Sequence, residues 1–245
     1  MAAPLIDRAL AVFLPAFDEV VVVRRSLAVD DTTVARFHAT LDELERARVA
    51  RYVFPHLRRD ATVSRGSLRE LLASLLGDRA ASLRFVVGPQ GKPALADRAL
   101  EFNVSHSGTW LYIAIAQKRE LGVDVEGGNR TPDVDRLAPT VFTPGERAEL
   151  HACDVAARPH AFLRGWTRKE AYVKVIGTGL SMPLADFSVS LGGDAAVQLV
   201  THALPHAALA HAIHDLPAPP GHAAALAWHR GAVAVRRVVL VDASA

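Results

Sequence analysis

The feature that most constrains the fold is an order of expected elements that occurs twice along the chain. Before Leu121, a β-branched strand at Val20–Val23 is followed by helical segments and then by further strands. After Leu121, the same order of strand, helices and strands returns. The repetition predicts two α+β halves that meet at a central seam, although no residue-level repeat accompanies it. We expect the N-terminal half to span residues 1–121 and the C-terminal half to span residues 122–245.

Two helices are expected in the first half. Thr40 resembles an N-cap, and the helix that follows it should run to about Tyr52, before Pro55. The second helix, at about 60–76, has leucines at helical spacing, with Gly77 placed as a C-terminal stop.

Arginines are concentrated in this helical region. The stretch Arg46–Arg69 contains seven arginines and only one acid, Asp60. Like charges at this density repel one another unless an anion lies among them. The cluster therefore indicates contact with a phosphorylated ligand or an acidic partner surface, and the alternative is a solvated helical face.

The remaining elements are predicted from alternation, turns and caps. Strands at 111–117 and 121–126 are joined by a short turn, which predicts a hairpin. A polar loop is expected at 127–139, and Thr143 with Glu146 forms a capping box that opens a helix. Further expectations are a turn at 88–91, a helix from about His160 to Gly177, and strands at 81–87, 101–110, 187–191, 196–200, 223–228 and 233–241.

Cysteine use and charge narrow the class of protein. Cys153 is the only cysteine, which excludes an intrachain disulfide and a cysteine-based zinc site. The first residues include Asp7 and lack a basic region before an apolar run, so a signal peptide is not expected. No apolar run is long enough to span a bilayer, and the net charge is only +2. We expect a cytoplasmic protein with no membrane or nucleic-acid partner.

Three carboxylates are candidates for a metal site. Asp124 and Glu126 are two residues apart on a strand, so they share a face and repel each other unless a cation lies between them. Glu170 and Lys174 are four residues apart on a helix that also carries Trp166, which we expect to pack in the core. If this helix crosses the strand ends, the three acids form an all-oxygen site of the kind that suits Mg²⁺. The alternatives are an exposed edge strand and a solvated ion pair.

Donors to an anionic substrate are also present. Lys92, Ser105, His106 and Lys174 surround the expected site, and metal, acid and base together are the requirements of phosphoryl transfer. A hydrolase triad of Ser105, His106 and Asp124 is disfavoured, because adjacent residues on a strand point to opposite faces. A nucleotide kinase or NTPase is disfavoured because the chain has no G-x-x-x-x-G-K-[ST] motif.

Four sequence blocks carry a family resemblance. In their order along the chain they resemble the signature blocks of the 4′-phosphopantetheinyl transferases, and more narrowly of the surfactin-synthetase-activating (Sfp) type. The similarity extends to about Leu191, and the arginine-rich helices extend it back to about Arg46. Gly165 departs from the pattern, because many relatives carry a larger apolar residue there. The blocks are GKPAL (Gly91–Leu95), FNVSHSG (Phe102–Gly108), GVDVE (Gly122–Glu126) and FLRGWTRKEAYVKVIGTGL (Phe162–Leu180).

The resemblance implies a pseudo-twofold monomer of two α+β halves, with coenzyme A bound in the cleft between them. It implies a Mg²⁺-dependent transfer of the 4′-phosphopantetheine group from coenzyme A to a serine of an acyl or peptidyl carrier protein, with release of adenosine 3′,5′-bisphosphate. This holo-[acyl-carrier-protein] synthase activity would serve polyketide, nonribosomal peptide or fatty acid synthesis. The alternative is a binding module that retains affinity for coenzyme A or a carrier without turnover.

The resemblance also implies roles for particular residues. It matches Asp124, Glu126 and Glu170 to the metal-binding acids. Glu170 is matched in addition to the general base for the incoming serine, and Lys174 to the lysine that contacts the pyrophosphate. The residues matched to contacts with coenzyme A are Arg48, Arg65, Lys92, Ser105, His106 and Lys174.

Overall fold

The computed structural model describes the chain at residues 13–88, 91–128, 132–177, 179, 182–193, 197, 199–201 and 210–243. The predicted turn at 88–91 and the predicted strand at 196–200 lie partly outside these residues. No helix in the described part of the chain is long and apolar enough to cross a membrane.

The larger sheet has the strand order β11-β1-β5-β4. Strand β1 (Glu19–Ser26) pairs in parallel with β11 (Arg237–Ala243) and antiparallel with β5 (Trp110–Ala116). Strand β4 (Glu101–Ser107) then pairs antiparallel with β5. The strand predicted at Val20–Val23 is confirmed, since these valines are at most 5% exposed and lie within β1.

The second sheet has the order β6-β10-β9. Strand β10 (His222–His229) pairs antiparallel with both β6 (Leu121–Gly127) and β9 (His211–Leu216). The sequence analysis missed β9, whose buried residues Ile213 and Leu216 are three positions apart, so they do not form the alternation expected of a strand. Two short antiparallel hairpins complete the strands: β2 (Phe85–Val87) with β3 (Pro93–Leu95), and β7 (Phe187–Val189) with β8 (Leu199–Thr201).

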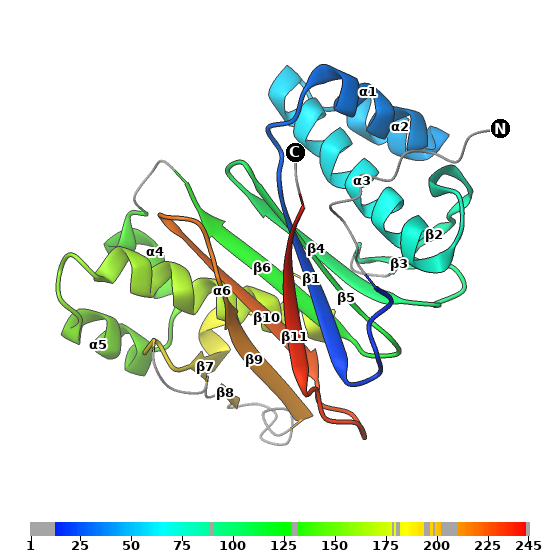
Figure 1. Cartoon of the computed structure of the whole chain (residues 1–245). Coiled ribbons are helices and arrows are strands. Elements are labelled where there is room, and N and C mark those ends of the chain that lie inside the picture. Colours follow the sequence, from blue (N-terminus) through cyan, green and yellow to red (C-terminus); the bar gives the residue numbers. More distant parts are fainter. Residues whose placement is uncertain are drawn as a thin grey trace.

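Helices lie on two sides of these sheets (Figure 1). Helices α1 to α3 gather near the β4–β5 side of the molecule, whereas α4 and α5 lie beyond the other sheet. Helix α6 packs against β6 and β10. Their bounds are α1 (Asp31–Thr40), α2 (Glu43–Ala50), α3 (Pro55–Leu76), α4 (Val134–Val141), α5 (Pro144–Ala152) and α6 (Arg158–Ile176), with 3₁₀ turns at Ala80–Ser82 and Leu184–Asp186.

The order of elements repeats in the structure. Strand β1, helices α1 to α3, the β2–β3 hairpin and the pair β4–β5 are followed by β6, α4 to α6, β7–β8 and β9–β10. In each series the first strand pairs antiparallel with the last, β1 with β5 and β6 with β10. The predicted α+β fold is therefore confirmed.

Strands β4 and β6 meet at a seam between the two sheets. They lie side by side but belong to separate sheets, and side chains of β4 bridge to the backbone of β6. Asn103 Oδ1 accepts a hydrogen bond from Val123 N at 2.9 Å. Ser105 Oγ accepts a hydrogen bond from Val125 N at 3.4 Å. Ser107 Oγ donates one to Gly127 O of β6 at 3.0 Å. Because alternate residues of a strand share a face, these three polar side chains replace ladder bonds along one edge.

The predicted hairpin between residues 111–117 and 121–126 is wrong. Both edges of β5 are taken, by β1 and β4, and β6 pairs with β10 instead. The hairpin in this region is β4–β5, whose tight turn includes Gly108 at φ 57°, a conformation that favours glycine. The four residues between β5 and β6 carry the chain from one sheet to the other.

The predicted N-cap at Thr40 is also wrong. Thr40 is the last residue of α1, a helix that the sequence analysis missed. Helix α2 is capped by Asp42, whose side chain accepts from Glu45 N while the Glu45 carboxylate accepts from Asp42 N. Both Thr40 and Asp42 are good cap residues, and each has a glutamate three residues later, so the capping-box pattern alone does not separate the two positions.

Helix α4 lies where a polar loop was predicted at 127–139. Residues 129–131 of that loop are outside the described part, and Asp133 then caps the helix. The apolar residues Val134, Leu137 and Val141 are at helical spacing, but the charged residues between them and Pro139 hide the pattern. Pro139 is tolerated inside this short helix.

Other caps agree with the sequence analysis. The capping box of Thr143 and Glu146 is formed at the start of α5. Gly77 and Gly177 follow α3 and α6 with φ of 67° and 72°, in the left-handed conformation expected of a C-terminal stop. Helix α3 begins at Pro55, so this proline opens the second helix as well as bounding the first.

The seam can be tested by removing one of its acceptors. Asn103→Leu leaves Val123 N buried without a partner, and we expect it to lower the free energy of unfolding by about 1 to 3 kcal/mol. Ser107→Ala is the matched control: Ser107 is less buried, so water can replace its bond, and we expect a loss of less than about 1 kcal/mol. Urea unfolding measures both variants, and equal losses would contradict a buried seam.

Candidate active site

The three predicted metal-binding acids come from two elements that pack directly on each other. Asp124 and Glu126 project from β6, and Glu170 projects from α6. The close packing depends on Gly122, because a Cβ there would lie 2.2 Å from Ala171 O. The helix therefore lies close enough to the strand for its polar side chains to reach the seam.

Asp124 is the centre of the site. It is 3% exposed, and its Oδ1 accepts hydrogen bonds from Ser105 Oγ at 2.8 Å and from Lys174 Nζ at 2.6 Å. Lys174 Nζ also donates to Val123 O at 3.0 Å. Asp124 Oδ2 is buried and has no hydrogen-bond partner among the described residues. A buried carboxylate oxygen without a donor is costly, so this atom favours a positively charged ligand.

The three carboxylates influence one another electrostatically. Burial raises the pKa of Asp124, against the opposing effects of Lys174 and Ser105. Burial also raises the pKa of Glu126 to about 7, and repulsion from Asp124 contributes to the rise. The pKa of Glu170 is raised by burial and then by Asp124. The acids are therefore close enough to repel, and a cation among them would lower that repulsion.

The donors present fit a hard divalent cation. Carboxylate oxygens are the preferred protein ligands of Mg²⁺, and the unpartnered Asp124 Oδ2 is an oxygen that such an ion would satisfy. As the side chains stand, the described residues contain no group of three His, Cys, Asp or Glu arranged to hold a metal ion. Lys174 instead contacts Asp124, so its ammonium supplies the positive charge nearest to that carboxylate.

Two of the predicted phosphate contacts already have protein partners. Lys92 Nζ donates to Leu121 O and to Lys174 O, both at 2.9 Å, so this ammonium caps the last turn of α6. Ser105 is buried and donates to Asp124. His106, the next residue, is exposed, as expected of neighbours on a strand. The serine is thus bonded to a carboxylate, and the hydrolase alternative gains no support.

The arginines predicted near a phosphate differ in their surroundings. Arg65 forms an ion pair with Glu45, and its guanidinium stacks 3.9 Å from the centre of the Phe85 ring. Arg69 is fully buried and pairs with Asp42 at 2.8 Å and with Glu45 at 2.6 Å. These pairs fasten α2 to α3, so part of the arginine cluster is structural. The acids that neutralise it lie just before the cluster in the sequence.

Arg48 has a different environment from Arg65. It lies in the last turn of α2, is exposed and forms no ion pair among the described residues. It is therefore available to an anionic ligand, as the resemblance implies.

Sequence reasoning missed Ser107 as a member of the site. Ser107 Oγ lies 3.3 Å from Glu126 Oε2, in the same way that Ser105 Oγ reaches Asp124. The signal was present in the spacing: serines two residues apart on β4 match carboxylates two residues apart on β6. Each seam serine contacts one seam acid.

Lys169 holds the helix that carries Glu170, and it was also missed. Its side chain is fully buried and forms an ion pair with Glu146 at 2.5 Å. A buried lysine is stable only when its donors are satisfied, and here each bond reaches a segment that packs on α6. The remaining acceptors of its Nζ are Val141 O at 2.9 Å, Leu184 O at 2.8 Å and Phe187 O at 2.8 Å.

Trp166 and Gly165 pack as expected of core residues. The Trp166 ring meets Phe162 edge to face with centroids 5.4 Å apart, and Trp166 is partly buried against the core. A Cβ on Gly165 would lie 2.4 Å from Leu191 Cδ2 and 2.7 Å from Phe142 Cζ. The departure from relatives at this position is therefore matched by close packing of its neighbours.

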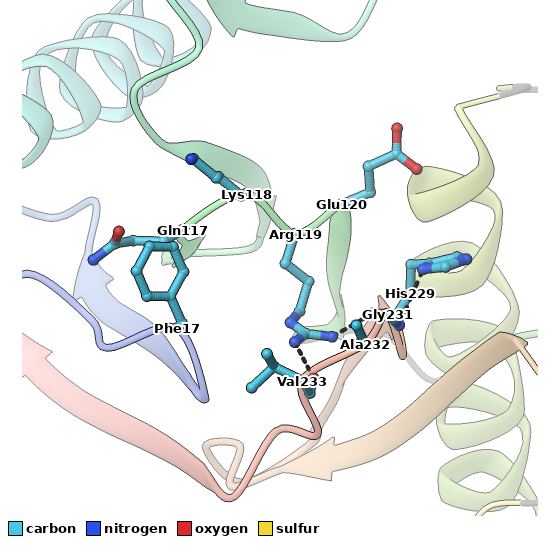
Figure 2. A pocket seen from close by; sticks show the side chains of 9 residues that line it. All are labelled: Phe17, Gln117, Lys118, Arg119, Glu120, His229, Gly231, Ala232 and Val233. Atoms are coloured by element: carbon cyan, nitrogen blue, oxygen red, sulfur yellow. Dashed lines mark hydrogen bonds between the residues drawn. The ribbon is translucent and has the colours of Figure 1, made fainter.

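A separate pocket lies near the beginning of β6, where Figure 2 shows Phe17, Lys118 and Val233 among its lining residues. Its volume is about 420 Å³. The buried Arg119 donates to His229 O at 2.7 Å and to Val233 O, so its guanidinium is occupied by the backbone. The carboxylates lie toward the other end of β6, and we assign no part of the chemistry to this pocket.

Two stretches of the chain match known protein families. Residues 120–227 match the family described as the 4′-phosphopantetheinyl transferase superfamily, and residues 30–118 match that described as 4′-phosphopantetheinyl transferase, N-terminal. The 4′-phosphopantetheinyl transferase HetI of Nostoc sp. (strain PCC 7120) is 36% identical over 168 residues, which cover 67% of this chain and 71% of HetI. The chain belongs to the 4′-phosphopantetheinyl transferase superfamily.

Further relatives agree with this family. The 4′-phosphopantetheinyl transferase Sfp of Bacillus subtilis (strain 168) is 35% identical over 118 residues, or 48% of this chain and 51% of Sfp. Among solved structures, a holo-(acyl-carrier-protein) synthase from Bacillus anthracis str. Ames in complex with CoA has 23% identity and a TM-score of 0.36, covering 45% of this chain and 94% of that one. That structural likeness is too low to add to the assignment.

Burial of Glu126 and its repulsion from Asp124 together lead to a pH-dependent prediction. Its pKa is about 7 in the folded protein against an ordinary 4.5, so the folded state binds this proton more tightly than the unfolded chain does. The resulting stabilisation is complete below the unfolded pKa and is lost as the pH rises through about 7. Between about pH 5 and about pH 8.5, the wild type should lose on the order of 1 to 3 kcal/mol of unfolding free energy that Glu126→Gln retains.

Denaturant unfolding at the two pH values, with a chelator present, measures this difference. Glu120→Gln is the matched control, because Glu120 is an exposed carboxylate that directly precedes β6, at the opposite end of the strand from Glu126. We expect the control to follow the wild type. Parallel pH profiles for the wild type and Glu126→Gln would show that the pKa of Glu126 is not raised in the folded protein.

Proposed function

We propose that the chain transfers the 4′-phosphopantetheine group of coenzyme A to a serine of an acyl or peptidyl carrier protein. The observation that carries the proposal is the group of Asp124, Glu126, Glu170 and Lys174 at the seam of a chain that belongs to this superfamily. HetI and Sfp, which match in sequence, are named as 4′-phosphopantetheinyl transferases. The carriers would be those of polyketide, nonribosomal peptide or fatty acid synthesis.

In this proposal, Asp124, Glu126 and Glu170 hold Mg²⁺. The ion, when bound, supplies positive charge to the pyrophosphate of coenzyme A. The unpartnered Asp124 Oδ2 supports this role. The raised pKa values of the three acids also support it, because burial, and for Glu126 and Glu170 repulsion from Asp124, disfavours the ionised acids unless a cation is near. Ser105 and Ser107 keep two of the carboxylates oriented toward the seam.

Glu170 is the proposed general base. Its carboxylate accepts the proton of the serine hydroxyl as the serine oxygen attacks the phosphorus atom of the phosphopantetheine group. Burial raises the pKa of Glu170, which makes its carboxylate a stronger base than an exposed one. The buried ion pair of Lys169 with Glu146 fixes the adjacent turn of α6, so the base is held in place.

Lys174 acts on the leaving side. The bond from the phosphorus atom of the phosphopantetheine group to the bridging oxygen of the pyrophosphate breaks. That oxygen departs with adenosine 3′,5′-bisphosphate, and negative charge develops on it. The Lys174 ammonium, already directed to the site by Asp124 and Val123 O, stabilises this charge or donates a proton to it. Charge that grows during the reaction is stabilised more in the transition state than in the ground state.

The remaining contacts with coenzyme A are assigned to basic and polar residues around the seam. Arg48 and His106 are exposed, which supports direct contact with phosphate groups. Arg65, Lys92 and Ser105 are bonded to protein groups, so coenzyme A would share or replace those partners. We assign these contacts mainly to residues 1–121, and the metal and catalytic groups to residues 122–245. We further propose that the protein acts as a cytoplasmic monomer.

Transfer can be measured as a gain in carrier mass. Purified protein incubated with coenzyme A, Mg²⁺ and an apo carrier should add one phosphopantetheine group to the carrier. Asp124→Ala and Glu170→Ala should each lower the rate by at least about 1,000-fold, because each removes charge or base chemistry from the reacting centre. Glu120→Ala, which removes an exposed acid directly before β6, should retain the wild-type rate.

Circular dichroism of the variants provides the folding control. Near-wild-type transfer by either variant would overturn the assignment of these acids. A wild type that binds coenzyme A but modifies no carrier from the three biosynthetic systems would instead support the binding-module alternative.

A further inference from the structure

Lys174 is held at both of its ends. Its Nζ donates to Val123 O at 3.0 Å and to Asp124 Oδ1 at 2.6 Å. Its backbone oxygen accepts a hydrogen bond from Lys92 Nζ at 2.9 Å, and a Cβ on Gly122 would lie 2.8 Å from the Lys174 Cβ. The backbone of Lys174 is therefore fixed against β6, so the acceptors of its ammonium decide where that charge points.

The third N–H of this ammonium takes its direction from the other two. A lysine ammonium has three donors, and within the described part of the chain two of them bind Val123 O and Asp124 Oδ1. A bond to Asp124 alone would leave the ammonium free to turn about that bond. The Val123 carbonyl adds a second fixed point. It therefore directs the remaining N–H, which the proposed reaction uses at the leaving oxygen.

The Val123 carbonyl is available to Lys174 because of the way its own amide is paired. The N–H and C=O of one strand residue point to the same side, so backbone pairing of β6 with β4 at Val123 would use both groups. Val123 N donates instead to Asn103 Oδ1 at 2.9 Å. A side-chain oxygen takes the amide alone, and the carbonyl of the same residue is left for the ammonium.

Asn103 holds the edge of β6 more closely than its neighbour on the same face does. It is 7% exposed, and its bond to Val123 N is shorter than the 3.4 Å bond from Val125 N to Ser105 Oγ. A buried amide is costly to leave without an acceptor, which keeps this bond formed. Asn103 lies on β4 in the first half of the chain, whereas Val123 and Lys174 belong to the second.

We propose that Asn103 is a positioning residue for Lys174. It binds the Val123 amide, leaves the Val123 carbonyl to the ammonium, and in this way directs Lys174 to the leaving oxygen. Asn103 itself needs no contact with coenzyme A. This inference rests on the proposed function, because Lys174 acts there on the leaving side. It follows that the two halves of the chain must be held in register at β4 and β6 for Lys174 to act.

The test compares loss of this acceptor with loss of stability elsewhere. Asn103→Leu replaces the amide with an apolar branch, and Asn103→Ala gives the same comparison if the leucine variant does not fold. The control is Asp30→Ala, which removes the N-cap of α1, where Asp30 Oδ1 accepts from Thr33 N at 2.6 Å. Transfer to an apo acyl carrier protein is measured at a temperature where circular dichroism shows every variant folded.

Steady-state kinetics give the first result. Asn103→Leu should lower kcat about tenfold or more, because a small misplacement of a catalytic group has a large effect on rate. KM for coenzyme A should stay within about threefold of the wild type, since the substrate contacts are unchanged. Asp30→Ala should match the wild type. A rise in KM for coenzyme A with no change in kcat would place Asn103 among the substrate contacts and overturn the proposal.

A double-mutant cycle separates positioning of Lys174 from a general structural role. In a Lys174→Met background, Asn103→Leu should lower the residual kcat less than about twofold, because the group that it positions is absent. An equal loss in both backgrounds would show that Asn103 does not act through Lys174.

Chemical labelling tests the same contact without transfer. Acetylation by acetic anhydride, measured by peptide mass spectrometry, reports how firmly the Lys174 amine is held, with the exposed Lys118 as the internal reference. Asn103→Leu should raise the labelling of Lys174 relative to Lys118 about threefold or more, because the site opens locally, and Asp30→Ala should not.

The labelling result distinguishes failure of this proposal from failure of the proposed function. If labelling rises in Asn103→Leu while the wild type modifies no carrier, Asn103 still positions Lys174 and the proposed function falls. If the wild type transfers the group and Asn103→Leu changes neither kcat nor labelling, the proposed function stands and the positioning role falls.

Discussion

The structure depends on the row of polar side chains that joins β4 to β6. Asn103, Ser105 and Ser107 bridge two strands that belong to separate sheets, so the seam is made by side chains where a continuous sheet would use its backbone. Side-chain bridges leave polar atoms available beside the strands, as a backbone ladder does not. The same alternation that builds the bridge also places Ser105 and Ser107 against the acids of β6.

The charges at the seam then determine which ligands the site favours. Asp124 is buried among groups that only partly satisfy it, and Glu126 and Glu170 add negative charge nearby. Lys174 reaches this charge because Gly122 lets α6 lie directly on β6, and Lys92 caps the end of the same helix. Lys169 anchors the helix from its other face. A site with surplus negative charge and an ammonium beside it favours a cation and a phosphate ester together.

Much of this site could be predicted from the sequence, because its signals are local. The spacing of Asp124 and Glu126, the helical stripe of Glu170 and Lys174, and the order of four blocks are all read within short windows. Features set by contacts distant in sequence were missed or misassigned. The pairing of β6 with β10 spans about a hundred residues, and the buried partners of Arg69 and Lys92 come from other elements. A short stretch of sequence around a charged side chain does not show whether a carboxylate or a backbone carbonyl will accept its hydrogen bonds.

The central claim is that the three seam acids together require a divalent cation. Thermal unfolding with coenzyme A, in chelator or in millimolar Mg²⁺, tests it most directly, because ligand binding to the folded state raises Tm. The account predicts that Mg²⁺ raises Tm of the wild type by about 3 °C or more, and that Glu126→Gln combined with Glu170→Gln removes most of this increase. An equal increase in both proteins, or none in the wild type, would contradict the claim.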